Sequence, residues 1–193
     1  MPYSASLGKT SAAEWVRHGQ ERSSPMQLLS LVFPAIMAYA AASDLLTMRI
    51  PNFISVALIV IFFGLAILVG VDWSTVAWHA AAGATMLVVC FLMYALGWIG
   101  GGDAKLAAAT VLWLGFTPVL LDYLLIVGLV GGMMGVLFLS IRRFPLPAFA
   151  LTWEWLVRLH DKKAGVPYGI ALAAAGLAVY PDSLLSLKLL GTV

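Results

Sequence analysis

The chain has 193 residues, of which 62% belong to the apolar set, whereas only eleven are Lys or Arg and nine are Asp or Glu. Soluble proteins average about 45–50% apolar and 25% charged residues, so this composition excludes a water-soluble enzyme. The formal net charge of +2 is spread along the chain without a basic block, which argues against nucleic acid as a partner.

Residues 1–25 are polar and contain no apolar stretch of the kind that a cleavable signal peptide requires, so we interpret them as an N-terminal tail. A transmembrane helix needs ~20 mostly apolar residues, and the apolar inventory therefore suffices for about six. We expect one all-α, polytopic membrane domain over residues 26–193. Its hydrophobic segments are predicted at 26–44, 53–71, 76–99, 104–121, 122–141 and 166–187.

The only long connection is predicted at 142–165. Pro145 and Pro147 end the fifth hydrophobic segment, because proline lacks a backbone N–H and breaks helices. A second, shorter helical pattern follows, with Glu154 and Arg158 near one face and Trp153 on another. This pattern predicts an amphipathic helix that lies on the membrane surface.

The distribution of cationic residues predicts the orientation, since Lys and Arg concentrate in cytoplasmic loops. With the N-terminus outside, seven of the eleven would be cytoplasmic, and four would not. The seven are Arg49, Lys105, Arg142, Arg143, Arg158, Lys162 and Lys163. We therefore expect the N-terminus outside and the loop 142–165 in the cytoplasm.

Two carboxylates stand apart from those in predicted loops, in the tail and in the surface helix. Asp44 closes the first hydrophobic segment and Asp103 opens the fourth, which places both at the same membrane boundary. Either could simply mark the end of a span, and Asp103 after Gly100–Gly102 could be an ordinary helix N-cap. As a pair, however, two adjacent carboxylates hold one proton between them and supply both a base and an acid.

Such a pair can activate water for peptide hydrolysis without a metal or a cofactor. His18, His79 and His160 lie in different segments without the spacing of metal ligands, so we expect no metal site. The single cysteine, Cys90, can form neither an internal disulfide nor a thiolate metal site. We expect no cofactor.

Three motifs together resemble the type IV prepilin peptidases, membrane aspartyl proteases with a Gly-x-Gly-Asp motif. Asp44 followed by Arg49-Ile50-Pro51-Asn52 is similar to the first aspartate region of the family. Gly100-Gly101-Gly102-Asp103-Ala104-Lys105 is similar to the second, and Val166-Pro167-Tyr168-Gly169 to the start of the last helix. The resemblance extends over about 26–187.

The resemblance implies that Asp44 and Asp103 are catalytic. It also implies that Gly100, Gly101, Gly102, Lys105, Arg49, Pro167, Tyr168 and Gly169 help to position the substrate. Structural interpretations remain open for several of these. Arg49 could anchor its loop or contact lipid phosphates, and Pro167 with Gly169 could simply start a helix or could pair with an extended substrate.

The chain differs from larger members of that family. They carry an N-terminal domain with two Cys-x-x-Cys pairs, associated with methylation of the new pilin N-terminus, and this sequence has neither the pairs nor the length. It resembles the peptidase-only branch that serves Flp-type, tight-adherence pili. The implied partners are an Flp-like prepilin and membrane lipid, and the implied location is the bacterial inner membrane with the active site facing the cytoplasm.

Two other functions remain as alternatives. A presenilin-type intramembrane protease also uses Gly-x-Gly-Asp, but the Pro-Ala-Leu motif expected near its last catalytic helix is not present at 166–169. A small proton-coupled transporter would use the two aspartates to bind protons or ions. The sequence has no clear inverted repeat, which disfavours the transporter.

Overall fold

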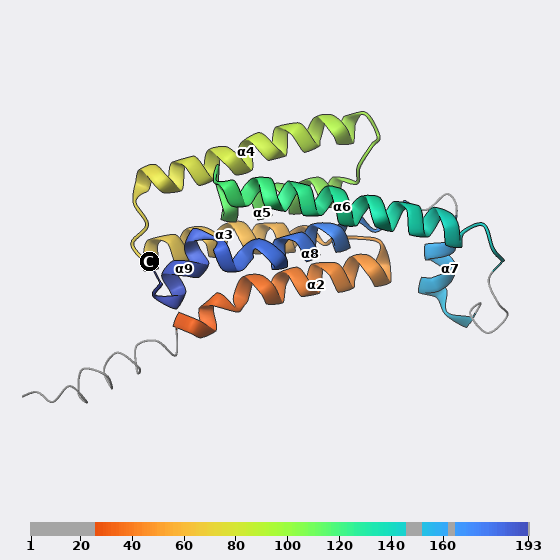
Figure 1. Ribbon diagram of the computed structural model, residues 1–193, viewed down its shortest axis with the longest axis horizontal. Helices are drawn as coiled ribbons and strands as arrows, with labels where there is room; N and C mark the ends of the chain where they lie inside the picture. Colours follow the sequence, from red (N-terminus) through yellow and green to blue (C-terminus); the bar gives the residue numbers. More distant parts are fainter. Residues whose placement is uncertain (1–25, 146–151, 162–164, 193) are drawn as a thin grey trace, which may run out of the picture.

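The computed structural model describes residues 26–145, 152–161 and 165–192, and within these ranges every regular element is a helix (Figure 1). The polar tail at 1–25 lies outside the described residues, as do 146–151 and 162–164 in the predicted loop. For the described part of the chain, the predicted all-α fold is confirmed.

The helices form a bundle with α7 at one end and the C-terminus at the other (Figure 1). They are α2 (Val32–Thr47), α3 (Asn52–Leu68), α4 (Trp73–Ala95), α5 (Gly101–Leu114), α6 (Pro118–Ile141), α7 (Glu154–His160), α8 (Tyr168–Val179) and α9 (Leu184–Leu190), with the short 3-10 helix η2 (Tyr180–Asp182) before α9. Helix α2 continues a helix that starts at Met26.

Three of these helices are long and apolar enough to cross a membrane. They are Met26–Thr47, Trp73–Ala95 and Pro118–Ile141. The pair Tyr168–Asp182 and Leu184–Leu190 would make a fourth span, although it is bent by 50°. The described residues thus provide three or four candidate spans, and the predicted six are not confirmed because α3 has 17 residues and α5 only 14.

Helix α5 lies in the centre of the bundle, where α3, α4 and α8 pack against it. All of its residues from Leu106 to Leu114 are buried. Small residues allow this close packing: a Cβ atom at Gly83 of α4 would lie 3.1 Å from Cβ of Leu112. On the α3 side, the buried indole N–H of Trp113 donates to the carbonyl of Leu58 at 3.1 Å. Because protein rather than lipid surrounds α5, it does not need the length of a lipid-facing span.

The turn between α5 and α6 does not lie where hydropathy predicted it. The expected boundary at 121–122 is wrong, because α5 already ends at Leu114 and α6 begins at Pro118. Gly115 has a φ of 65°, a conformation that favours glycine, and Pro118 occupies the first turn of α6, where its missing N–H costs nothing. The apolar run continues through this turn, so hydropathy placed the boundary several residues too late.

Helix α7 has seven residues and falls within the predicted loop 142–165. It packs against α2 and α6 at their ends, and its Leu159 is buried. The guanidinium of Arg158 donates to the carbonyls of Leu46 and Thr47 at 3.4 and 3.3 Å, where α2 ends. A location of α7 on the cytoplasmic membrane surface stays a prediction.

The contact between α4 and α5 leads to a test of the packing. We expect Gly83→Val to destabilise the protein by about 1–3 kcal/mol, because the added side chain overlaps Leu112 and the carbonyl oxygen of Ala108. Thermal unfolding in detergent measures the change. Gly64→Val is the matched control, since Gly64 also lies within a helix but a Cβ atom there would meet nothing within 4 Å. Equal melting temperatures for the two variants would contradict the close approach of α4 and α5.

Candidate active site

Asp44 lies in the last turn of α2 and is buried, with 5% of its surface exposed. Its Oδ2 atom accepts a hydrogen bond of 2.7 Å from the backbone N–H of Gly169, at the start of α8. The bond joins two segments that are 125 residues apart in the sequence. A buried carboxylate needs such a partner, because an unpaired one costs several kcal/mol.

The chain reverses direction directly after Asp44. Met48 adopts a left-handed conformation with φ of 52°, and its N–H donates to the carbonyl of Asp44 at 2.8 Å. The hydroxyl groups of Ser43 and Thr47 both donate to the carbonyl of Arg49, at 2.9 and 3.2 Å. These bonds fix the short connection to α3 and hold Ile50 beside the candidate site.

Asp103 lies in the first turn of α5, and its carboxylate accepts a hydrogen bond from the backbone of Gly100, the N-cap residue. This is the reciprocal half of a capping box, in which the third helical residue reaches back to the N-cap amide. A Cβ at Gly100 would lie 2.8 Å from Oδ2 of Asp103, and one at Gly102 would lie 3.2 Å from Cβ of Ile50. The first and third glycines of the motif therefore leave room for the carboxylate and for the α2–α3 connection.

The two carboxylates lie together. Both line one cavity of about 660 Å³, and the charge of Asp44 acts on Asp103. The other lining residues are Thr47, Met48, Arg49, Gly100, Arg158, Gly165, Val166 and Pro167. We call this space the dyad cavity. Of the predicted positioning residues, it thus contains Gly100, Arg49 and Pro167.

The segment before α8 forms one wall of the dyad cavity. The N–H of Tyr168 donates to the carbonyl of Val166 at 2.8 Å, which makes a tight turn at Pro167. Gly169 approaches closely: a Cβ there would lie 2.7 Å from both Oδ2 of Asp44 and Cδ1 of Ile50. The ring of Tyr168 packs on Gly131 of α6, where a Cβ would lie 2.6 Å from the ring.

Sequence reasoning missed the role of Arg142, at the end of α6. Its side chain is buried, with 7% exposed, and its Nε donates to the carbonyl of Leu159 at 2.8 Å. One terminal nitrogen donates to the carbonyl of Gly165 at 2.9 Å. Arg142 thus ties α6 and α7 to the segment that supplies Gly169. The sequence showed only a charge at a span end, since backbone acceptors leave no side-chain pattern.

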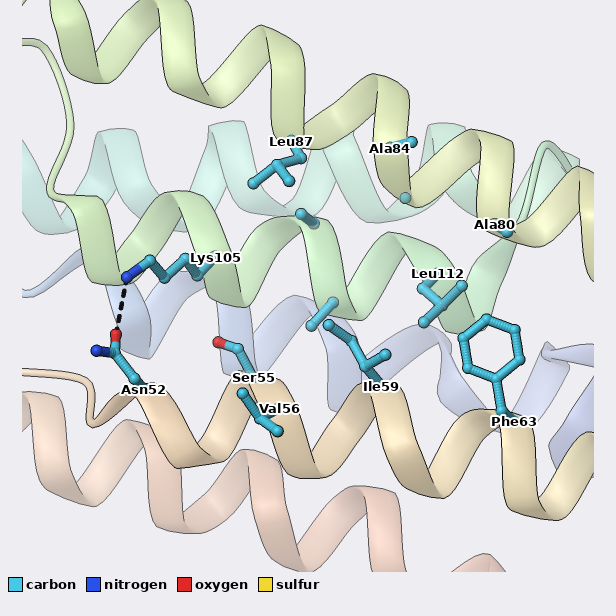
Figure 2. Close-up of a pocket in the computed structure, with 13 residues that line it drawn as sticks. Asn52, Ser55, Val56, Ile59, Phe63, Ala80, Ala84, Leu87, Lys105 and Leu112 are labelled. Atoms are coloured by element: carbon cyan, nitrogen blue, oxygen red, sulfur yellow. Dashed lines mark hydrogen bonds between the residues drawn. The ribbon is translucent and has the colours of Figure 1, made fainter.

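Lys105 and Gly101 lie outside the dyad cavity. Figure 2 shows the ammonium group of Lys105 bonded to the side-chain oxygen of Asn52 at 2.9 Å, which joins the starts of α5 and α3. Both residues line a separate, mainly apolar groove of about 500 Å³ between α3, α4 and α5. A Cβ at Gly101 would lie 3.4 Å from the ring of Tyr94. These contacts fix the position of α5, and with it that of Asp103.

The arrangement places two carboxyl groups in one polar cavity. Two carboxylates close enough to influence each other titrate as a pair and share a proton over a range of pH. Among the described residues, no group of three or more His, Cys, Asp or Glu side chains is placed to hold a metal ion. The chemistry that fits this donor set is acid–base activation of water.

Comparison with known proteins identifies the family. The family model described as "Type IV leader peptidase family" matches residues 31–141, a range that contains both Asp44 and Asp103. The chain belongs to the type IV leader peptidase family. No curated protein and no solved structure matches it. Together with the apolar helices, the family indicates that this leader peptidase is a membrane protein with a pilin precursor as its substrate.

The close approach of Gly169 to Asp44 leads to a second prediction. We expect Gly169→Ala to reduce cleavage of a pilin precursor at least tenfold, because the added methyl group displaces the carboxylate of Asp44 or the side chain of Ile50. Initial rates of cleavage in proteoliposomes measure the effect. Gly132→Ala in α6 is the control, since its Cβ meets nothing within 4 Å, and it should cleave normally. Normal cleavage by Gly169→Ala would contradict the contact.

Proposed function

We propose that this leader peptidase is an aspartic-type endopeptidase in which Asp44 and Asp103 form the catalytic dyad. The observation that carries the proposal is that helices α2 and α5 bring both carboxylates to one cavity, each with a backbone N–H as partner. The family match favours a leader peptidase over a proton-coupled transporter or a presenilin-type protease. A catalytic role for Asp44 and Asp103 also explains why hydrogen bonds fix the end of α2 and the start of α5.

In the resting dyad, one carboxylate is ionised and the other is protonated. The ionised carboxylate takes a proton from water, and the water oxygen attacks the carbonyl carbon of the scissile peptide. The protonated carboxylate donates its proton to the carbonyl oxygen, which gives a neutral tetrahedral intermediate. The protonated carboxyl of the dyad then donates its proton to the leaving nitrogen as the C–N bond breaks, and the ionised carboxylate takes a proton from one hydroxyl group of the intermediate, so the products are an amine and a carboxylic acid. The dyad is left with one proton, as it began.

For the substrate, we propose an Flp-like pilin precursor that loses its short leader. The three motifs support the family, and the resemblance to its peptidase-only members supports the Flp-type branch. The sequence also has only one cysteine, so it lacks the two Cys-x-x-Cys pairs associated with methylation of the pilin N-terminus.

For the location, we propose the bacterial inner membrane, with the dyad cavity facing the cytoplasm. Five described Lys or Arg residues, namely Arg49, Lys105, Arg142, Arg143 and Arg158, belong to the end of the bundle that holds the dyad. Of the described cationic residues, only Lys188 belongs to the opposite end, near the C-terminus in Figure 1. Cationic residues concentrate on the cytoplasmic side of membrane proteins, so the bias supports this orientation.

Substitution of the dyad tests the catalytic proposal. We expect Asp44→Asn and Asp103→Asn each to abolish cleavage of the precursor, because an amide keeps the shape of the side chain but cannot accept or relay the proton. The double variant should be no slower than either single one, since residues that act as a unit are strongly non-additive. Release of the leader by purified protein in proteoliposomes is the measurement.

Asp72→Asn and Asp122→Asn serve as controls at the opposite end of the bundle. Asp72 caps α4 by accepting from the N–H of Ser74, and Asn is an equally good N-cap, so both controls should cleave at the wild-type rate. A dyad variant that elutes as a folded protein and still cleaves near that rate would contradict the aspartic mechanism.

Cysteine labelling tests the orientation. In a Cys90→Ser background, we expect Phe144→Cys to react with an impermeant maleimide only from the cytoplasm and Trp73→Cys only from outside. Both positions are strongly exposed, at 71% and 70%, and they lie at opposite ends of the bundle. The reverse labelling pattern would show that the dyad faces outward.

A further inference from the structure

A second cavity begins at Asp103 and extends away from the dyad cavity. It has a volume of about 460 Å³ and lies between α4, α5, α6 and α8. Among the described residues that line it, Asp103 is the only charged one, and nearly all the rest are apolar. We call this space the apolar cavity.

The apolar cavity is elongated along α5. Its floor runs from Asp103 through Ala107 to Val111, which corresponds to about 12 Å at the helical rise of 1.5 Å per residue. Val89 contributes to the wall formed by α4, and Val127 to the wall formed by α6. Helix α4 packs mainly on α5 and helix α6 mainly on α8, which leaves the space between them.

The two cavities differ in chemistry and share one residue. The dyad cavity presents Arg49, Arg158 and the backbone around Gly165, whereas the apolar cavity presents aliphatic, Met and aromatic side chains. Asp103 lines both. A peptide that extends from one cavity into the other therefore passes a proposed catalytic carboxylate at the point where its surroundings change from polar to apolar.

We infer that the apolar cavity binds the apolar side chains that follow the scissile bond of the pilin precursor. The inference rests on the proposed function, in which a pilin precursor loses its short leader, and it adds that this leader is polar and that a hydrophobic segment follows it directly. The leader then occupies the dyad cavity and the start of the hydrophobic segment occupies the apolar cavity. This placement puts the polar leader in the polar cavity and the hydrophobic segment in the apolar cavity, whereas the reverse placement would put each in a cavity of the opposite polarity.

The size of the apolar cavity determines how much of the substrate it takes. The floor of the cavity is about 12 Å long, whereas a hydrophobic helix of ~20 residues spans ~30 Å, so the cavity takes only part of the substrate helix. One stripe of its side chains does fit, as in other complexes where a helix lies in a groove. The substrate helix accordingly lies along the opening between α4 and α6.

A bulky substitution in the wall tests the inference. Val89 lines the apolar cavity and is half-exposed, at 48%, whereas its neighbour Val88 is 60% exposed and lines neither cavity. With wild-type precursor in proteoliposomes, we expect Val89→Trp to raise KM at least fivefold with kcat within about twofold. Val88→Trp, the same substitution one residue away, should leave both within twofold of wild type. A precursor with Ala at the first apolar positions after the cleaved bond should narrow the difference in KM between the two variants.

Photo-crosslinking provides a readout that does not depend on turnover. In the Asp44→Asn background, we expect p-benzoylphenylalanine at position 89 to crosslink to the precursor just after the scissile bond, and at position 88 not to do so. Crosslinks at position 89 to lipid only would overturn the inference. If the wild-type protein cleaves and Val89→Trp and Val88→Trp behave alike, the inference alone is wrong. If the wild-type protein cleaves no pilin precursor, the proposed function and the inference both fail.

Discussion

The hydrogen bond from Gly169 to Asp44 is the interaction on which the rest of the site depends. A carboxylate that is 95% removed from solvent needs a partner that replaces water, and the N–H of Gly169 provides it at 2.7 Å. This distance is possible only because glycine has no Cβ. The start of α8 must therefore reach the end of α2, and Arg142 contributes by holding the carbonyl of Gly165 just before α8. The contacts of one buried carboxyl group thus join the end of α2 to the start of α8, which Arg142 ties to the end of α6.

The position of Asp103 depends on a different constraint, the burial of α5. Ala-rich α5 is enclosed by its neighbours, and small residues such as Gly83 let them approach it closely. Two hydrogen bonds hold its first turn. One runs from the backbone of Gly100 to the carboxylate of Asp103, and the other from Lys105 to Asn52. A catalytic carboxylate must be held to within a fraction of an ångström, and a helix locked on several sides provides that rigidity better than a loop. The same burial explains why α5 is shorter than a lipid-facing span.

The sequence predicted the meeting of Asp44 and Asp103 because it follows from the order of the apolar segments. An odd-numbered segment ends and an even-numbered one begins on the same side, whatever the details of packing. The number of spans could not be predicted in the same way, since hydropathy does not distinguish an apolar residue that faces lipid, as on α6, from one that faces protein, as on α5. Gly115 and Pro118 were a local signal for the position of the turn, which hydropathy placed several residues too late. The part played by Arg142 left no signal, because it binds backbone carbonyls.

The position of the proposed dyad at the ends of helices follows from two opposing requirements. Hydrolysis consumes water, which the hydrocarbon region does not provide. The apolar segment of the substrate, in the inference above, binds within that region. Asp103, in the first turn of α5, satisfies both because it lines the polar and the apolar cavity at once. In this arrangement the start of the apolar segment determines which bond lies beside the carboxylates. A shift of the dyad by one helical turn, about 5.4 Å, would bring a different bond of the substrate to the carboxylates. The register of α5 in the bundle is therefore part of the specificity as well as of the fold.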